Sequence, residues 1–97
     1  MQVVTVIRGL PFVNAQKMRE RHPETFEAPS YEELTAIKPG DYLKVCLNEE
    51  RFWTKVVSIS GDAIIATVEN DLVINNLPCD TLVEFHKHHI FTTHLPE

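Results

Sequence analysis

The sequence predicts an α+β fold that is mostly β, either a small curled antiparallel sheet or an SH3-like open barrel of four to five strands, with one short N-terminal helix. Two observations favour this class. From residue 42 to residue 85, runs rich in β-branched and aromatic residues alternate with short Asn, Asp and Gly breaks, as in consecutive antiparallel strands. Before residue 42, a short segment carries the cap and stop signals of a helix. The 97 residues suffice for one modest core, so we expect a single domain, 1–97.

Four strands are predicted between residues 42 and 85, at 42–47, 51–60, 63–69 and 81–85. Successive side chains of a strand point to opposite faces, so an alternating apolar pattern identifies the core face. The predicted core residues are Leu43, Val45, Leu47, Ile64, Ala66, Val68, Val83 and Phe85.

The second predicted strand carries large apolar side chains on both faces. Alternation places Trp53, Val57 and Ile59 on one face and Phe52, Thr54 and Val56 on the other. This pattern indicates a central strand packed on both sides or a curled sheet. Phe52 and Trp53 cannot both point inward from a flat strand, so one of them is expected to be half-exposed.

The first 36 residues are expected to supply a strand at 3–7 and the helical part of the fold. The strand is apolar on both faces, so we expect it to be covered on both sides or to lie in an interface. Asn14 is a suitable N-cap, and Pro23 ends the helix that follows it. Ser30 and Glu33 match a capping box, which predicts a single helical turn over residues 31–36.

The charge balance argues against two classes of partner. Nine Lys and Arg residues against fourteen Asp and Glu residues give a net charge of −5, and residues 61–85 hold five acids and no base. Nucleic-acid binding draws most of its affinity from cations that neutralise phosphates. We therefore expect no nucleic-acid partner and, for the same reason, no acidic membrane surface.

The cysteines and the N-terminus favour a cytoplasmic location. Cys46 and Cys79 have no metal or redox spacing, and two thiols in a domain with its own core are typical of a reducing compartment. A disulfide between them is also compatible with the sequence, which does not determine their separation. The first eight residues lack the basic start and long apolar run of a signal peptide.

A set of short motifs between residues 36 and 90 resembles a known family. They are Pro39-Gly40-Asp41 before a strand, the run Arg51-Phe52-Trp53-x-x-Val56, the Gly61-Asp62 turn, the segment Val68-x-Asn70-Asp71-Leu72, and a late strand closing on His89-Ile90. Their order and spacing resemble the DUF2314-like family of small bacterial domains of unknown function. That family usually has Gly-Asp where this chain has Cys79-Asp80, and an acidic ending that this chain lacks. The resemblance implies a small, mostly β cytoplasmic domain and transfers no catalytic residue.

The leading functional hypothesis is a non-enzymatic protein-binding or accessory module. Its candidate binding residues are Tyr42, Phe52 and Trp53, because an aromatic side chain exposed on a small sheet can receive an extended peptide. Strand addition to a free sheet edge is an equivalent mode. The expected partner is an unidentified protein or peptide, and a homodimer through the N-terminal strand or a sheet edge is compatible with this interpretation.

The alternative hypothesis is a metal-binding or metal-sensing protein. On an extended chain His86 and His88 share a face, and His89 follows them, so these three are the candidate ligands. His94 or His22 could complete the set, because a stable zinc site needs three or four ligands. The simpler interpretation of these histidines is an exposed strand end whose imidazoles titrate near neutral pH.

Enzymatic activity is the least supported class, so we expect a protein that is not an enzyme and has no cofactor. A nucleophilic Cys46 or Cys79, with His88 or His89 as the base, is the third hypothesis. Neither cysteine has a sequence neighbour that would activate it. Three glycines in the whole chain are too few for a glycine-rich phosphate loop.

Overall fold

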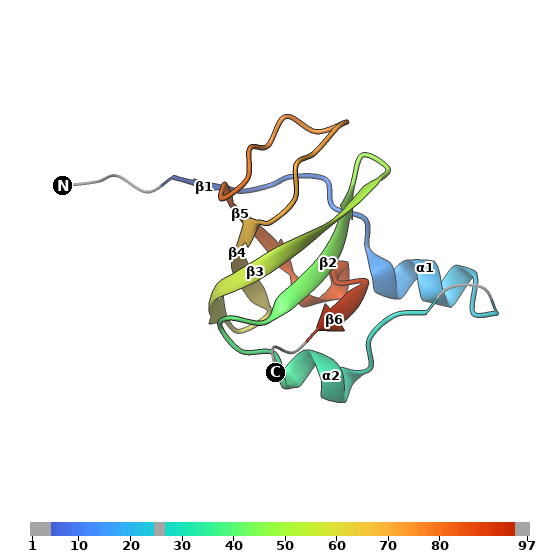
Figure 1. The fold of residues 1–97 in the computed structure, drawn as a ribbon. Helices are drawn as coiled ribbons and strands as arrows, with labels where there is room; N and C mark the ends of the chain where they lie inside the picture. The colour runs from blue at the N-terminus through green and yellow to red at the C-terminus, as the bar shows by residue number, and fades with distance from the viewer. Residues whose placement is uncertain (1–4, 25–26, 95–97) are drawn as a thin grey trace.

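The computed structural model describes residues 5–24 and 27–94 and confirms the predicted α+β, mostly β class. Six strands form one sheet in the order β1-β5-β4-β3-β2-β6, and the sheet is not closed into a barrel. Figure 1 shows that the sheet is strongly curled. The elements are β1 (Val6–Ile7), α1 (Ala15–Arg21), α2 (Tyr31–Thr35), β2 (Tyr42–Leu47), β3 (Glu50–Ser60), β4 (Ala63–Val68), β5 (Leu82–His86), the short 3-10 helix η1 (Lys87–His89) and β6 (Thr92–His94).

The β2–β3 hairpin sets the register of the sheet. Asn48 and Glu49 form its two-residue turn, and both have positive φ values, 50° and 68°, as tight hairpin turns of this length require. Leu47 therefore pairs with Glu50, and two residues further along β3 Phe52 is opposite Val45. Residues that are directly opposite share a face, so the side chain of Phe52 follows Val45 into the core.

The main core lies inside the curl of the sheet, and every predicted core residue is buried there. Among the described residues, fourteen buried side chains form it: Phe12, Leu34, Ile37, Leu43, Val45, Leu47, Phe52, Val56, Ile64, Ala66, Val68, Val83, Phe85 and Ile90. Phe12, in the segment before α1, contacts the rings of Phe52 and Phe85 with centroid separations of 6.4 and 5.5 Å. The burial of these rings supplies much of the apolar contact that stabilises the fold.

A β-bulge corrects the predicted alternation of β3. The pairing with β4 shifts register between Val56 and Ser58, which adds one residue to β3. Ile59 consequently packs against the main core, whereas Trp53, before the bulge, lies on the outer face. The prediction that Trp53 and Ile59 share a face is therefore wrong. Val57, at the bulge, is 50% exposed.

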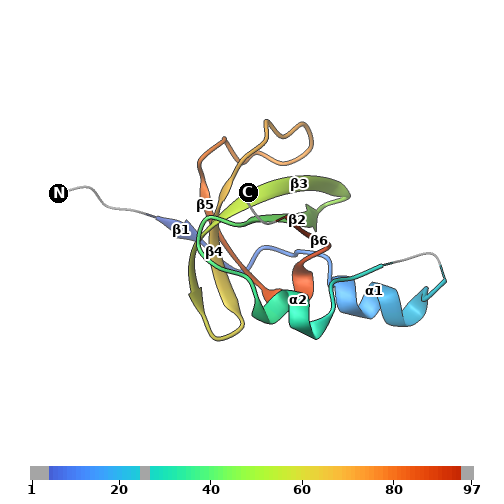
Figure 2. The same ribbon diagram turned by 60° about the horizontal axis from the view of Figure 1, so that its bottom comes forward.

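Both helices begin at the predicted caps and lie below the sheet in the view of Figure 2. The Asn14 side chain accepts a hydrogen bond from the Lys17 N–H at 3.0 Å, and Ser30 and Glu33 form the predicted capping box. The interior of α1 contains neither proline nor β-branched residues. The helix ends at Arg21, before Pro23, which cannot continue it. Ala15 of α1 packs with Cys46 and Phe91 in a second, smaller cluster.

The two sheet edges differ from the prediction. β1 joins β5 in parallel, with Val6 opposite Leu82, so the sheet is mixed and not purely antiparallel. Its two residues are half-buried, and the predicted strand residues Val3 and Val4 lie outside the described part of the chain. The opposite edge is β6, an additional short strand that pairs antiparallel with β2. The sheet therefore has six strands where four to five were expected.

Candidate binding groove

A groove of about 390 Å³ lies on the outer face of the sheet, next to the β6 edge. Its lining residues, which we call the aromatic groove, are Tyr42, Trp53, Glu69, Asn70 and His94. Two of them are the aromatic residues that the sequence predicted for a binding surface. The groove faces away from the main core, because the neighbours of Trp53 in β3, Phe52 and Thr54, are the side chains that turn inward.

Strand register brings the groove residues together. Tyr42 of β2 is directly opposite His94 of β6, so their side chains share the outer face. The His94 ring lies 6.4 Å from the Tyr42 ring and 6.3 Å from the Trp53 ring, between centroids. At the other side of the groove, the Trp53 N–H donates a 2.7 Å hydrogen bond to the Asn70 side chain, and Glu69 N–H donates to the Trp53 carbonyl. These contacts hold the end of β4 against β3.

Two lysines flank the rings. The Lys44 ammonium lies 5.7 Å from the Trp53 ring centroid, and the Lys55 ammonium lies 5.8 Å from that of Tyr42. Both distances are within the range of cation–π attraction. Although the whole chain carries a charge of −5, two cations border this groove and Glu69 is the acid that lines it.

Phe52 does not belong to this surface. Its side chain is 1% exposed, at the centre of the main core, whereas Trp53 is half-buried and reaches the groove. The sequence correctly predicted that one of the two rings would be partly exposed. The prediction of Phe52 as a binding residue is therefore corrected, and Tyr42 and Trp53 remain. His94 is a groove residue that the binding hypothesis missed, because its strand was not predicted.

The candidate metal ligands form a separate cluster around η1. The imidazole centroids of His86 and His88 are 5.5 Å apart, those of His88 and His89 are 4.1 Å apart, and those of His86 and His89 are 5.9 Å apart. The chain is a 3-10 turn from Lys87 to His89, so the extended geometry assumed for these residues is wrong. The turn nevertheless gathers the three rings.

A hydrogen bond within this cluster competes with metal binding. The His86 N–H donates to Nδ1 of His89 at 3.0 Å, which leaves Nε2 of the neutral His89 ring as the protonated nitrogen. Ligation through Nε2 would require the other tautomer and would break this bond. In residues 5–24 and 27–94, the group of three donor atoms lying within 4.8 Å of one another is Glu69, Cys79 and Asp80. The metal hypothesis thus requires the histidine cluster to rearrange.

Burial and the neighbouring imidazoles favour the neutral forms of His88 and His89. Burial, followed by the charges of His88 and His86, lowers the pKa of His89 to about 4. Burial and the neighbouring His86 also lower the pKa of His88. The His89 ring contacts the core ring of Phe12 at 5.9 Å, so a proton on His89 would place charge beside the core.

We expect His89 to make the fold sensitive to mild acid. Its pKa is about 4 in the folded state and about 6.5 when unfolded, so the unfolded chain binds more protons between these values. The stability that depends on a neutral His89 is fully present above pH 6.5 and is lost as the pH falls toward 4. After allowance for solvent screening, it amounts to about 1–2 kcal/mol. Urea unfolding at pH 7 and pH 4.5 should show a smaller pH dependence for His89→Gln than for wild type.

The matched control for this prediction is His22→Gln, which removes an exposed imidazole that does not contribute to the lowered pKa of His89. An equal pH dependence in wild type and His89→Gln would contradict the assignment.

The two cysteines are free thiols in different environments. Cys46 is buried in the second cluster, and Cys79 is exposed. Burial raises the pKa of Cys46, while partial desolvation and the carboxylates of Asp80 and Glu69 raise the pKa of Cys79. A raised pKa lowers the thiolate fraction at neutral pH, and the thiolate is the nucleophile. These environments are the reverse of those that activate a catalytic cysteine.

Comparison with known proteins assigns no family or function to this chain. No protein-family profile, curated protein or solved structure matches the chain. Membership of the DUF2314-like family therefore stays a prediction. Among the described residues, each helix is too short or too polar to cross a bilayer.

Proposed function

We propose that this protein is a non-enzymatic binding module that takes up an extended segment of another protein along β6, with one side chain of that segment in the aromatic groove. The observation that carries the proposal is the position of the groove beside an edge strand. His94 belongs to both, because it lines the groove and ends β6. A segment paired with β6 would therefore run past the mouth of the groove.

The edge of β6 supports backbone recognition. In the described part of the chain β6 pairs with β2 on one side, and no strand covers its other side. An added strand can form main-chain hydrogen bonds with such an edge, while pockets beside the edge select alternate side chains. β6 has only three residues, so its backbone would contribute few bonds. The groove must therefore supply much of the affinity.

The groove has the composition of a side-chain pocket in a protein interface. Trp and Tyr rings offer large, rigid contact areas, and buried aromatic residues often dominate interface energies. The volume of about 390 Å³ is sufficient for one large side chain or two small ones. Lys44 and Lys55 at its border favour a segment that also carries an acid.

The environment of the thiols supports a reducing compartment for this module. Cys46 and Cys79 are both unpaired, one buried and the other exposed. A persistent exposed thiol is typical of the cytoplasm. We therefore place the proposed binding function there.

Selection from a random peptide library with the immobilised protein tests the proposal. We expect a family of extended peptides to be enriched, and Trp53→Ala should weaken their affinity by about tenfold or more, because it removes the largest ring of the groove. Isothermal titration of one synthetic peptide against each variant measures the loss.

The matched control is Val57→Ala, which trims another exposed side chain of β3 outside the groove. It should bind the peptide as wild type does. If Trp53→Ala and Val57→Ala retain equal affinity for every selected peptide, the groove is not the binding site.

A further inference from the structure

We infer that a second copy of this chain can occupy the aromatic groove, through an exposed loop at residues 71–76 that we call the Glu50-anchored loop. The inference rests on the proposed function, since it names one partner of the same groove. Exchange of the loops between two grooves would form a reciprocal dimer. Figure 1 shows the loop, in orange, beside the tip of the β2–β3 hairpin.

The side chain of Glu50 organises this loop. One carboxylate oxygen accepts the Val73 N–H at 2.6 Å, and the other accepts the N–H groups of Ile74 and Asn75 at 3.1 and 3.0 Å. The Asn75 side chain donates to the same carboxylate at 3.0 Å and to the Leu47 carbonyl at 2.8 Å. Successive backbone N–H groups that converge on one anion hold a loop in a single shape. The hydrogen bond from Val73 is the main reason that the pKa of Glu50 is lowered.

This anchoring leaves two aliphatic side chains in solvent. Val73 is 91% exposed and Ile74 is 61% exposed, so they are among the most exposed large apolar residues that the structure describes. Because the backbone of both residues is bound to Glu50, they cannot turn inward without breaking those hydrogen bonds. An ordered loop that presents adjacent aliphatic side chains is suited to insertion into an apolar pocket.

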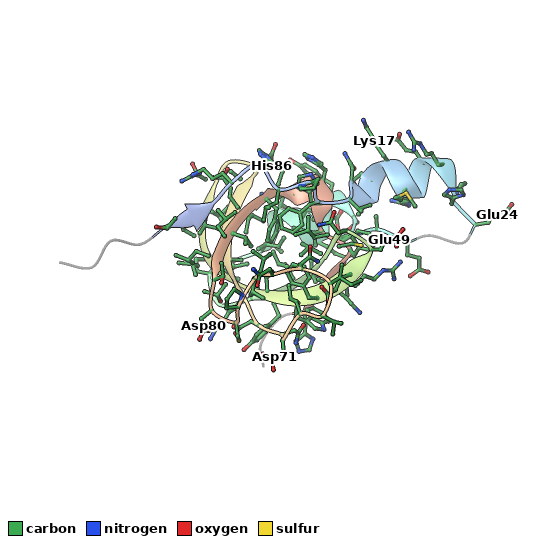
Figure 3. The ribbon with its side chains drawn as sticks, turned by 90° about the horizontal axis from the view of Figure 1, so that it is seen from above. Lys17, Glu24, Glu49, Asp71, Asp80 and His86 are labelled. Carbon is green, nitrogen blue, oxygen red and sulfur yellow. The ribbon has the colours of Figure 1, made fainter. Side chains whose placement is uncertain are left out.

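Charge makes the groove of a second copy a suitable receptor. The span from residue 61 to residue 85 holds five acids and no base, and Asp71 lies within the loop itself. Figure 3 shows Asp71 and Asp80 on one side of the molecule and His86 on the opposite side. The groove that would receive the loop is bordered by Lys44 and Lys55. Opposite charges around an apolar contact favour this pairing over a pairing of loop with loop.

The position of the loop allows a two-fold arrangement. Glu69 and Asn70 line the groove and lead directly into the loop, so both surfaces lie on the same side of one molecule. A two-fold axis between two such sides would bring each loop to the other groove. Both contacts are small in comparison with the roughly 1,200 Å² of a stable interface, so the dimer should be weak and concentration-dependent.

Sedimentation velocity of the untagged protein tests this inference. We expect the weight-average sedimentation coefficient of wild type to increase as the protein concentration is raised from about 20 µM to about 1 mM, as it does for weak dimers. Val73→Asp alters the loop and Trp53→Ala alters the groove, so each variant should remain monomeric over this concentration range. Val57→Asp is the matched control, since it adds the same charge at another exposed valine, and it should associate as wild type does.

An equimolar mixture of the two defective variants provides the decisive arm. Trp53→Ala keeps an intact loop and Val73→Asp keeps an intact groove, so the mixture restores one of the two contacts. Unlabelled Trp53→Ala should therefore shift the NMR amide signals of Tyr42 and His94 in isotope-labelled Val73→Asp. Monomeric wild type at 1 mM would overturn the inference. Dimers that Val73→Asp leaves intact, or groove signals that Trp53→Ala leaves unchanged in labelled Val73→Asp, would also overturn the pairing of loop with groove.

The same variants separate this inference from the proposed function. Val73→Asp leaves the groove residues in place and should bind a selected peptide at least as tightly as wild type. If wild type is monomeric and the peptide still requires Trp53, the groove binds other proteins but not a second copy. If neither the loop nor any peptide requires Trp53, both proposals fail.

Discussion

Phe52→Ala is expected to lower the free energy of unfolding by about 3–5 kcal/mol, the usual cost of removing a buried phenylalanine ring. Phe52 is 1% exposed, and its ring contacts that of Phe12 in the main core. A domain of this size has a total stability of about 5–15 kcal/mol, so the loss would be a large share of it. Urea unfolding followed by far-ultraviolet circular dichroism measures the change.

The adjacent Trp53 provides the matched comparison. Trp53→Ala should cost about 1–2 kcal/mol, because its half-buried ring leaves a surface depression and no internal cavity. The two neighbouring substitutions should therefore separate stability from binding. A greater loss of stability from Trp53→Ala than from Phe52→Ala would contradict the inward orientation of Phe52.

Glu50→Gln is expected to release residues 73–75. The amide group of Gln offers one acceptor oxygen where the carboxylate has two, so at least the Val73 N–H loses its partner. Hydrogen exchange followed by NMR should show the amides of Val73, Ile74 and Asn75 exchanging about tenfold faster or more, because local opening becomes easier. Glu50→Gln should also weaken the self-association of the protein, because the released loop no longer holds one shape.

Glu49→Gln is the control for this prediction. It makes the same change of charge at the neighbouring, exposed residue, which has no contact with the loop amides in the described hydrogen-bond network. Its loop amides should exchange as in wild type. Equal acceleration in both variants would mean that overall charge, and not the carboxylate contact, controls the loop.

The orientation of Phe52 and Trp53 depends on one turn residue. Alternation shows that one ring points inward but does not determine which. If the break after Leu47 has two residues, Asn48 and Glu49, then Glu50 belongs to the strand and Phe52 lies opposite Val45. The sequence interpretation assigned Glu50 to the break as well, so this pairing was not available to it.

Features determined by local sequence were predicted well. The caps at Asn14 and Ser30 act within three residues, and both helices begin where these caps place them. The alternating core residues of β2, β4 and β5 are likewise a local pattern, and all of them are buried.

Features determined by distant partners were not predicted. β6 consists of only three polar residues, and Thr92-Thr93 is its single β-forming signal. The contact of Glu50 with residues 73–75 spans 23 to 25 positions and has no sequence signature. Three of the five groove residues, Glu69, Asn70 and His94, therefore required the structure, and His94 enters the groove through the pairing of β6 with β2.

The most direct test of the binding proposal is an amide NMR spectrum of the protein recorded with and without a peptide selected by it. The proposal predicts shifts confined to the groove and its edge, led by Tyr42, Trp53 and His94, together with a shift of the Trp53 indole N–H. Shifts centred on the histidines of η1, with the groove signals unchanged, would contradict it.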